Sequence, residues 1–322
     1  MFVGIDHGTV AIRFACISDT EEDTKKLEAK AKIFELRRDE AARMSDVDIL
    51  SAVEAGLGVR REDWKLVAVT YSMGDAFSTI RRLSDVEGRG SLEGGAGTFV
   101  GGGTKVFDAV KRAGLPAILI PGIHARLEID DRMKFFSHGA SPEKVGIAYF
   151  IYKSGFENFV FSDVSSNTVT VAVAGGRILG ALDACIFAPG MKHGPLDLQL
   201  IRDVDSGKMT ANEAFSRGGV LTKPHFATNA DVDEASALKT LALFVAMELS
   251  AMSVLVSEFA EDFEFFTTGA VGEREDFRAA VERHLKRGVR SVPRYSAALG
   301  CALIARDVFR DAKEILGIAV EI

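Results

Sequence analysis

Two stretches of this sequence share one layout, and that repetition constrains the fold more than any other feature. At the N-terminus, the apolar run MFVGI ends at Asp6, passes through a short turn and continues as AIRFACIS (11–18). Segment 157–184 repeats this order, with an apolar run ending at Asp163, a turn of small polar residues and two more apolar runs. Such runs between short turns predict strands. We therefore expect an α/β chain whose two halves each open on a strand that ends in an aspartate, as after an internal duplication.

The remaining segments predict alternating helices and strands. Segment 45–58 is typical of a helix, because Ser45 or Asp46 can cap its start and a glycine ends it. Segment 141–155 predicts another helix, with Ser141 as its cap and Pro142 at its first position. The other expected strands are 31–38, 65–72, 116–125 and 263–272, and the other expected helices are 105–114, 195–205, 233–257, 273–287 and 295–315.

Composition excludes several classes of protein. The net charge of the 322 residues is -7, which argues against a nucleic-acid-binding surface. The three cysteines, Cys16, Cys185 and Cys301, are far apart, which argues against a disulfide framework or a cysteine-ligated metal. The apolar stretch 240–260 carries two glutamates and is more typical of a core helix than of a membrane span. No leader peptide is evident, so we expect a cytoplasmic protein without a membrane partner.

Several polar or glycine-rich segments allow two interpretations. The turn at Asp6-His7-Gly8-Thr9 is either a plain hairpin or a loop for phosphate and metal. Segment 87–104 holds eight glycines before an expected helix, so it is either a linker or a set of backbone N–H groups for an anion. Asp75, after an apolar strand, either acts on a substrate or caps the next turn.

Four motifs together resemble the actin-like ATPase superfamily, which includes sugar kinases, acetate kinases, actin and heat-shock ATPases. GIDHGT (4–9) and SDVSSNTV (162–169) are similar to its two phosphate hairpins, FFTTGAVG (265–272) to its adenosine loop and YSAALGCALIA (295–305) to its connecting helix. The resemblance implies two duplicated ribonuclease H-like domains with a nucleotide cleft between them. The expected domains are 1–140, joined by a returning helix at 300–322, and 141–300.

The same resemblance implies ATP and Mg²⁺ as cofactors. Asp6 and Asp163 are expected to hold Mg²⁺ through water and to take part in catalysis. The small residues around them are expected to contact the nucleotide. These residues are Gly8, Thr9, Ser165, Ser166, Asn167, Gly269 and Gly272.

The middle of the chain resembles the acetate and butyrate kinase branch. His138, in FFSHGASPEKVGIAY (135–149), takes the place of a histidine near the transferred phosphate. Acyl kinases have an arginine after the second hairpin, where this chain has Lys192 and His193. Lysine supplies charge without the planar fork of arginine. Over its whole length, the chain also resembles methanogenesis marker protein 12 of methanogenic archaea.

Two functions stay open at this stage. One is a slow, partner-dependent ATPase switch or maturation factor in methanogen metabolism, and the other is a phosphotransferase on a small carboxylate. The partners are accordingly a nucleotide with either a small carboxylate or another protein, and a homodimer is a further candidate. Iron–sulfur activators share this fold, but no cysteine pair here has their spacing. The small residues Ala297, Ala298, Gly300 and Ala302 are expected to form a hinge at the domain contact.

Overall fold

The computed structural model describes residues 1–21, 23–71, 77–87, 101–223 and 232–322. The chain divides into two compact units: unit 1 comprises Met1–Phe156 and Tyr295–Ile322, and unit 2 comprises Glu157–Arg294. The divisions therefore differ from the expected boundaries at 140 and 300. Unit 1 extends past 140 because the helix at Glu143–Lys153 (α5) packs against the helix at Ser296–Phe309 (α11).

Unit 1 is built on an eight-stranded sheet with the order β14-β15-β5-β6-β4-β1-β2-β3. β1 pairs antiparallel with β2 and parallel with β4, β2 pairs antiparallel with β3, and β4 pairs parallel with β6. The expected opening strands are thus confirmed. In sheet order the strands span Glu314–Ile315, Ile318–Glu321, Ile80–Arg82, Ala117–Leu119, Leu66–Val69, Phe2–Asp6, Ala11–Ile17 and Lys32–Arg37.

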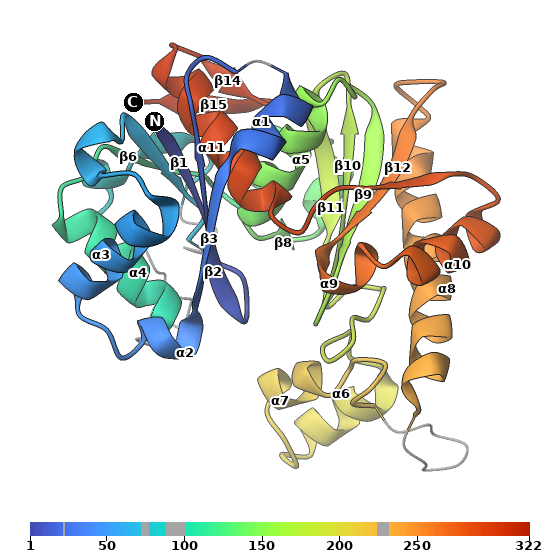
Figure 1. Cartoon of the computed structure of the whole chain (residues 1–322). Coiled ribbons are helices and arrows are strands. Elements are labelled where there is room, and N and C mark those ends of the chain that lie inside the picture. Colours follow the sequence, from blue (N-terminus) through green and yellow to red (C-terminus); the bar gives the residue numbers. More distant parts are fainter. Residues whose placement is uncertain (22, 72–76, 88–100, 224–231) are drawn as a thin grey trace. The chain divides into compact units, whose positions relative to one another are not determined.

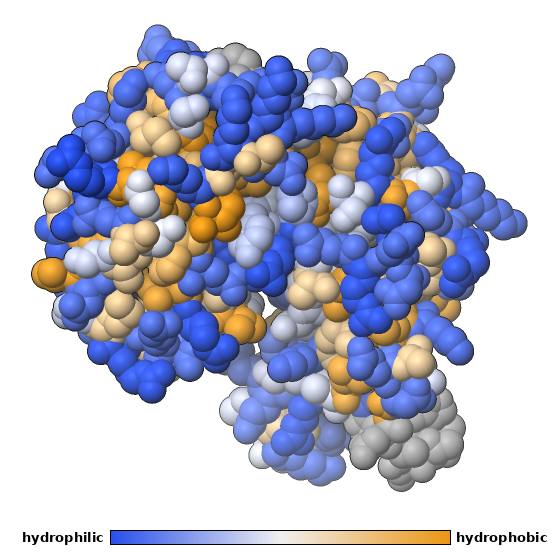
Figure 2. All heavy atoms as spheres, in the orientation of Figure 1, coloured by the Kyte–Doolittle hydropathy of each residue, from blue (hydrophilic) through white to orange (hydrophobic). Residues whose placement is uncertain are grey.

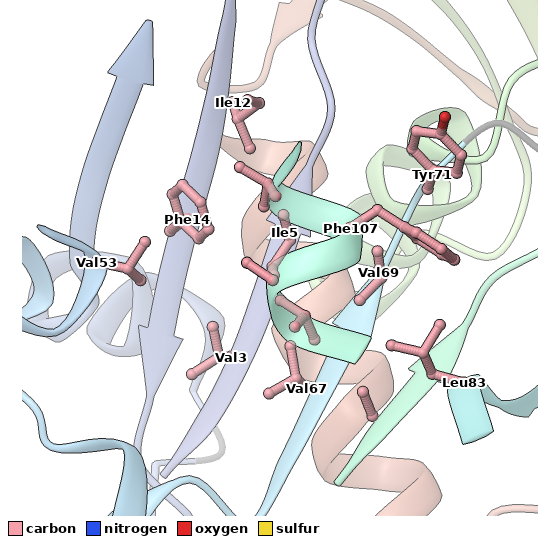
Figure 3. Packing of buried hydrophobic residues seen from close by; sticks show 14 of the residues in the cluster. Val3, Ile5, Ile12, Phe14, Val53, Val67, Val69, Tyr71, Leu83 and Phe107 are labelled. Carbon is pink, nitrogen blue, oxygen red and sulfur yellow. The ribbon is translucent and has the colours of Figure 1, made fainter. Parts of the chain in front are cut away.

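Helices cover both faces of this sheet (Figure 1). α3 (Asp46–Leu57) and α4 (Gly102–Arg112) lie on one face, where alternate residues of β1, Val3 and Ile5, join the apolar core (Figure 3). α3 has the expected caps, because the Ser45 hydroxyl accepts from the N–H of Asp48 and Gly58 ends the helix at φ 59°. The shorter helices of unit 1 are α1 (Thr24–Lys30) and α2 (Arg38–Ala41).

On the opposite face, α11 lies in backbone contact with its neighbours. A Cβ at Gly4 would lie 2.0 Å from the carbonyl oxygen of Ala298, and one at Gly300 would lie 1.8 Å from that of Gly146. Only glycine therefore fits at these positions of β1 and α11. The small residues of α11 pack inside unit 1 against β1 and α5, and their expected place at a domain contact stays a prediction.

Unit 2 has a five-stranded sheet with the order β11-β10-β9-β12-β13. α8 (Glu234–Val256) packs on β9 and β10, and α10 (Glu275–Leu285) packs on α8. The expected strand at 263–272 is wrong in its second half, because Gly269 adopts φ 87° and starts the one-turn helix α9 (Gly269–Gly272). The remaining elements are β9 (Phe159–Val164), β10 (Thr168–Ala174), β11 (Arg177–Leu182), β12 (Glu264–Thr268), β13 (Val289–Ser291), α6 (Leu198–Asp205) and α7 (Ala211–Ser216).

The two sheets share one pattern of strands. In unit 1, β3-β2-β1 are antiparallel and β4 and β6 follow β1 in parallel. In unit 2, β11-β10-β9 are antiparallel and β12 and β13 follow β9 in parallel. Asp6 and Asp163 therefore lie near the ends of equivalent strands. This order is what an internal duplication predicts, and the duplication itself stays a prediction.

Hydrophilic side chains cover most of the visible surface of each unit, with smaller hydrophobic groups among them (Figure 2). Within the described ranges, the helix at Glu234–Ser257 is long and apolar enough to cross a membrane. Half of its most apolar window is buried inside the protein, and it packs on the sheet of unit 2. The structure thus uses it as a core helix.

Candidate functional site

Asp6 lies at the end of β1 with an exposed fraction of 3%. Its cross-strand neighbour on β2 is Arg13, whose Nη1 lies 3.2 Å from Oδ2 of Asp6. Arg13 also reaches Glu35, with 3.2 Å between its Nε and Oε2 of the glutamate. The other carboxylate oxygen of Asp6, Oδ1, is buried and has no hydrogen-bond partner. The strand end thus holds a carboxylate with one oxygen paired and one available.

A second acid and a buried cation stand at the start of α5, near Asp6. Lys144 is 5% exposed, and its Nζ lies 2.7 Å from Oε1 of Glu143. The hydroxyl of Ser141 donates to the same glutamate oxygen. Burial raises the pKa of Glu143, but the charge of Lys144 and the hydrogen bonds from Lys144 and Ser141 bring the net pKa below its ordinary value. Glu143 is therefore ionised at neutral pH.

These neighbours set the charge of Asp6. Burial raises the pKa of Asp6 to about 6, and the negative charge of Glu143 adds to that rise. Arg13 and Lys144 oppose it. Two acids and two cations therefore share a buried place in unit 1. Mg²⁺ usually keeps several waters and binds through one or two carboxylates, so the unpartnered Oδ1 of Asp6 suits a magnesium-bound water.

The rest of the first turn is shaped around Arg13. A Cβ at Gly8 would lie 2.8 Å from the carbonyl oxygen of Ala11 and 3.0 Å from Nη1 of Arg13, so glycine leaves room for the arginine to reach Asp6. Thr9 is exposed. The ring nitrogens of His7 are buried without hydrogen-bond partners, and burial together with the charge of Arg38 lowers the pKa of His7 to about 3. His7 is thus neutral at physiological pH.

In unit 2, the second turn and the expected adenosine loop meet. Thr268 of β12 lies beside Asp163 of β9 in the parallel register. A Cβ at Gly269 would lie 2.2 Å from Oδ1 of Asp163 and 2.5 Å from Oγ of Ser165. The N–H of Ala270 donates to the Ser165 hydroxyl at 2.9 Å. Gly272 is buried, and its carbonyl oxygen accepts from the hydroxyl of Thr267 at 2.8 Å.

The loop at 190–193 lies against the same turn. The main-chain N–H groups of Lys192 and His193 both donate to the carbonyl oxygen of Ser166, at 2.9 and 2.8 Å. A Cβ at Gly190 would lie 2.2 Å from Cα of Asn167, so this approach needs glycine. The side chain of Lys192 is exposed. The structure therefore brings Asp163, Ser165, Ser166, Asn167, Lys192, Gly269 and Gly272 into one part of unit 2.

His138 belongs to unit 1, where it begins the short strand β8 (His138–Ala140) and pairs with His124 on β7 (Ile123–His124). His124 is buried. Its Nδ1 accepts from the N–H of Arg126 at 3.2 Å, so Nε2 carries the proton and donates to the carbonyl oxygen of Phe77 at 2.9 Å. His124 is thus part of the scaffold. Asp75 and residues 88–100 of the glycine-rich segment lie outside the described residues.

No family model matches the sequence. The chain is 50% identical to the UPF0285 protein of Methanosarcina barkeri, a match that covers 99% of this chain and 98% of that one. It is 42% identical to the UPF0285 protein of Methanocaldococcus jannaschii, over 99% and 98% of the two chains. The chain belongs to the UPF0285 family. Its membership in the methanogenesis marker protein 12 group stays a prediction.

Comparison with solved structures identifies the fold of this UPF0285 protein. A propionate kinase from Francisella tularensis matches with a TM-score of 0.63 at 11% identity, over 95% of this chain and 98% of that one. An acetate kinase from Porphyromonas gingivalis matches with a TM-score of 0.58 at 12% identity, over 95% and 98%. A ROK family protein from Streptococcus pneumoniae, in complex with sucrose, matches with a TM-score of 0.51 at 11% identity, over 97% and 100%. These likenesses confirm an α/β chain with the fold of the actin-like ATPases and sugar kinases.

Sequence reasoning missed Arg13, Glu143 and Lys144 of the UPF0285 chain. Arg13 becomes visible only when β1 and β2 are set in register, which places it across from Asp6. Glu143 and Lys144 follow Pro142 at a helix start, where an acid is ordinary and carries little signal. Their proximity to Asp6 depends on how α5 packs in unit 1.

Proposed function

We propose that this UPF0285 protein binds Mg·ATP and acts as a slow ATPase switch on a protein partner, in the cytoplasm of a methanogen. The observation that carries the proposal is the environment of Asp6. A carboxylate that is 97% buried is costly unless its oxygens are paired, yet Oδ1 has no hydrogen-bond partner. A bound metal-water group accounts for that oxygen.

The residues of unit 1 fit Mg²⁺ and phosphate. Asp6 and Glu143 would hold the hydrated ion through its waters, and Arg13 would hold Asp6 in position through their ion pair. When bound, Mg²⁺ supplies positive charge to the phosphate oxygens of the nucleotide. The main-chain N–H groups of Gly8 and Thr9 would contact phosphate. The exposed Thr9 hydroxyl is the remaining group that we assign to phosphate binding in this turn.

The residues of unit 2 fit the remainder of a nucleotide. Gly269 lets the backbone turn tightly over Asp163 and Ser165, whose atoms fill the space that a side chain would need, and the main chain of this turn would contact the nucleotide. Asp163 would act on the ion, and Ser165, Ser166 and Asn167 would donate to phosphate. The cleft between two domains, implied by the family resemblance, stays a prediction.

We expect slow turnover because of the positively charged side chains that the chain has for the transferred phosphoryl group. A well-placed arginine at the transferred phosphoryl group is worth roughly 10³–10⁵ in rate. At the corresponding place this chain has Lys192, which is exposed and lacks a bidentate fork. Arg13 already pairs with Asp6 and Glu35. We therefore expect hydrolysis that is slow until a protein partner completes the site.

The alternative is a phosphotransferase acting on a small carboxylate. One observation favours it. The main-chain N–H of Lys192 donates a hydrogen bond to the carbonyl oxygen of Ser166, so the lysine side chain extends from a point directly beside the second turn. In that case His138 and Lys192 would both face the transferred phosphate. The two functions differ in what accelerates the release of ADP.

Thermal unfolding with nucleotide tests the proposal. Millimolar Mg·ATP should raise the melting temperature, since a ligand of the folded state stabilises it by mass action. Asp6→Asn should remove the Mg²⁺-dependent part of that rise. Asp19→Asn is the matched control, because Asp19 is an aspartate of the same unit that pairs with Lys65 and Arg310 away from the turn. No shift in the native chain, or an unchanged shift in Asp6→Asn, would overturn the proposal.

Turnover assays separate the two functions. For a switch, ADP release should be slow and should not respond to acetate, propionate or butyrate. For a phosphotransferase, a carboxylate should accelerate ADP release, and both Lys192→Ala and His138→Ala should abolish that acceleration. Formation of an acyl phosphate that depends on Lys192 would replace the switch with the alternative.

A further inference from the structure

A buried acid of α8 holds the segment that follows β11. Glu248 is fully buried on α8, which packs on β9 and β10. Its Oε2 accepts a hydrogen bond from the N–H of Ala188 at 2.7 Å. One helical turn earlier on α8, the ring centre of Phe244 lies 5.7 Å from that of Phe187. α8 therefore contacts this segment through one polar group and one apolar ring.

The residues that follow lie on the second turn. The N–H of Met191 donates to the carbonyl oxygen of Ser165 at 3.0 Å, and the N–H of Lys192 donates to that of Ser166. We call residues 187–193 the Lys192 loop. Its first part is bonded to Glu248 and its last part to the turn, so it connects α8 with the turn at 165–167.

An acid at this buried place does not serve the stability of the core. At nearby positions α8 has the fully buried side chains of Leu241 and Leu249. Burying a carboxyl group costs free energy unless it is hydrogen-bonded, and an apolar residue of similar volume is often at least as stable. The role of Glu248 is therefore better explained by the main chain that it holds at Ala188.

We propose that Glu248 is a positioning residue whose carboxyl group holds the Lys192 loop closed on the turn at 165–167, and that the loop loosens when this group releases its proton to water. The neutral group accepts from Ala188 without placing a charge in the interior. The ionised group is a buried charge, and opening of the loop lets water reach it. The proposal rests on the proposed function only for the ligand that the turn would bind.

The charges around Glu248 decide the direction of the pH effect. In the closed loop its pKa is raised to about 7, mainly by burial, and Asp183, the charged group that acts on it within the described residues, adds to the rise. In water the ordinary value is 4.5. Between these values the closed loop binds a proton that the open loop does not, so each pH unit favours opening by up to about tenfold. Above pH 7 both forms are ionised and the effect ends.

His193 of the same loop acts in the opposite direction. Burial lowers its pKa from the ordinary 6.5, and the charge of Lys192 adds to that change. Protonation of His193 at acid pH therefore favours opening. This contribution is the same in the native chain and in a variant at position 248, so a comparison of the two removes it.

Hydrogen exchange without nucleotide tests the proposal. The main-chain amides of residues 191–193 report on the loop, and those of α10 report on the rest of unit 2. Glu248→Gln stays neutral and keeps an acceptor for Ala188. Relative to this variant, and after correction for intrinsic exchange, protection of the loop amides in the native chain should fall by more than about tenfold from pH 5 to pH 7.

A second variant separates the hydrogen bond from the charge. Glu248→Leu is also neutral but leaves the buried N–H of Ala188 without its acceptor. Loop protection in Glu248→Leu should therefore be lower than in Glu248→Gln by more than about fivefold at every pH. Equal protection in the two variants would show that the bond to Ala188 does not hold the loop, and would overturn the proposal.

Glu234→Gln is the matched control, because Glu234 is an exposed glutamate in the first turn of the same helix. This variant should keep the native pH profile. The same profile in the native chain and in Glu248→Gln would overturn the proposal. An equal fall in the amides of α10 would assign the effect to unfolding of unit 2 and would overturn it as well. Because nucleotide is absent, failure of Mg·ATP to bind would contradict the proposed function without changing these results.

Discussion

The two aspartate turns occupy equivalent strand ends and are stabilised in different ways. The first turn depends on charge: Asp6 is buried with Arg13, Glu143 and Lys144 as its electrostatic neighbours. The second depends on close backbone packing, because Gly190 and Gly269 allow two loops to lie directly on residues 163–167. Asp163 itself is only partly buried.

Because the two turns are stabilised differently, we expect them to respond to different changes, although they lie on the same pattern of strands. A buried cluster of charges responds to an ion or to a proton, since either changes its electrostatic balance. A turn on which other loops pack closely through glycine residues has little space for added atoms, so larger side chains there disrupt it. We expect ligand-dependent behaviour to concentrate in the first turn and steric sensitivity in the second.

The largest effect should follow Gly269→Ala. The added methyl group would lie 2.2 Å from Oδ1 of Asp163, and φ is 87°, so we expect a loss of about 3–5 kcal/mol in the free energy of unfolding. Gly207→Ala has a similar φ of 73° with no atom within 4 Å of the added carbon, so it should cost only about 1–2 kcal/mol. Urea titration measures both, and equal losses would contradict tight packing at the second turn.

A pH-dependent loss should come from the buried acid of unit 2. The pKa of Glu248 is raised to about 7, mainly by burial and further by the negative charge of Asp183. Hydrogen bonds from Thr170 and from the N–H of Ala188 oppose this rise. Because the folded pKa exceeds the ordinary 4.5, the stabilisation is complete below pH 4.5 and is lost as pH rises towards 7. The loss amounts to at most about 3 kcal/mol.

Glu248→Gln isolates this contribution from that of Asp6, whose raised pKa acts in the same direction. The difference in unfolding free energy between the native chain and the variant should change across this pH interval. Denaturant titrations at several pH values measure it. A difference that stays constant with pH would show that Glu248 does not titrate there.

A smaller effect should follow Arg13→Met. Asp6 would lose its direct ion pair, and because it can respond by taking up a proton, we expect a loss of about 2 kcal/mol. The loss should be greater above pH 6 than below it, since only the ionised carboxylate needs the arginine. Arg37→Met, which removes an exposed pair with Asp39, should cost much less, because solvent screens that pair. Thermal melts in matched buffers distinguish the two variants.

Much of the fold was predictable because local patterns determine it. The opening strands and α3 follow from alternating apolar residues and from caps at Ser45 and Gly58. The end of β12 was not predictable from hydropathy, since Val271 continues an apolar run while Gly269 turns the chain through a positive φ. The expected returning helix at 300–322 is wrong in its second half, because α11 ends at Phe309 and the chain turns at positive φ at Asp311, Leu316 and Gly317 to form β14 and β15.

The candidate site was predictable only in part. Asp6 and Asp163 stand out at strand ends, and glycines mark the turns beside them. Arg13, Glu143 and Lys144 surround Asp6 through strand register and through the packing of α5, which are not local properties of the sequence. The extent of unit 1 was missed for the same reason, because the contact of α5 with α11 joins distant segments.

The division of the chain has a consequence for its synthesis on the ribosome. Unit 2 is one continuous segment, so all its strands have been made once Arg294 has emerged. Unit 1 must wait for α11, the helix that lies against Gly4 and Gly146. Until then, the apolar surfaces of β1 and α5 that α11 covers remain open in the nascent chain. A segment made after unit 2 therefore completes unit 1, and a stop codon shortly before Ser296 would leave unit 1 without its closing helix.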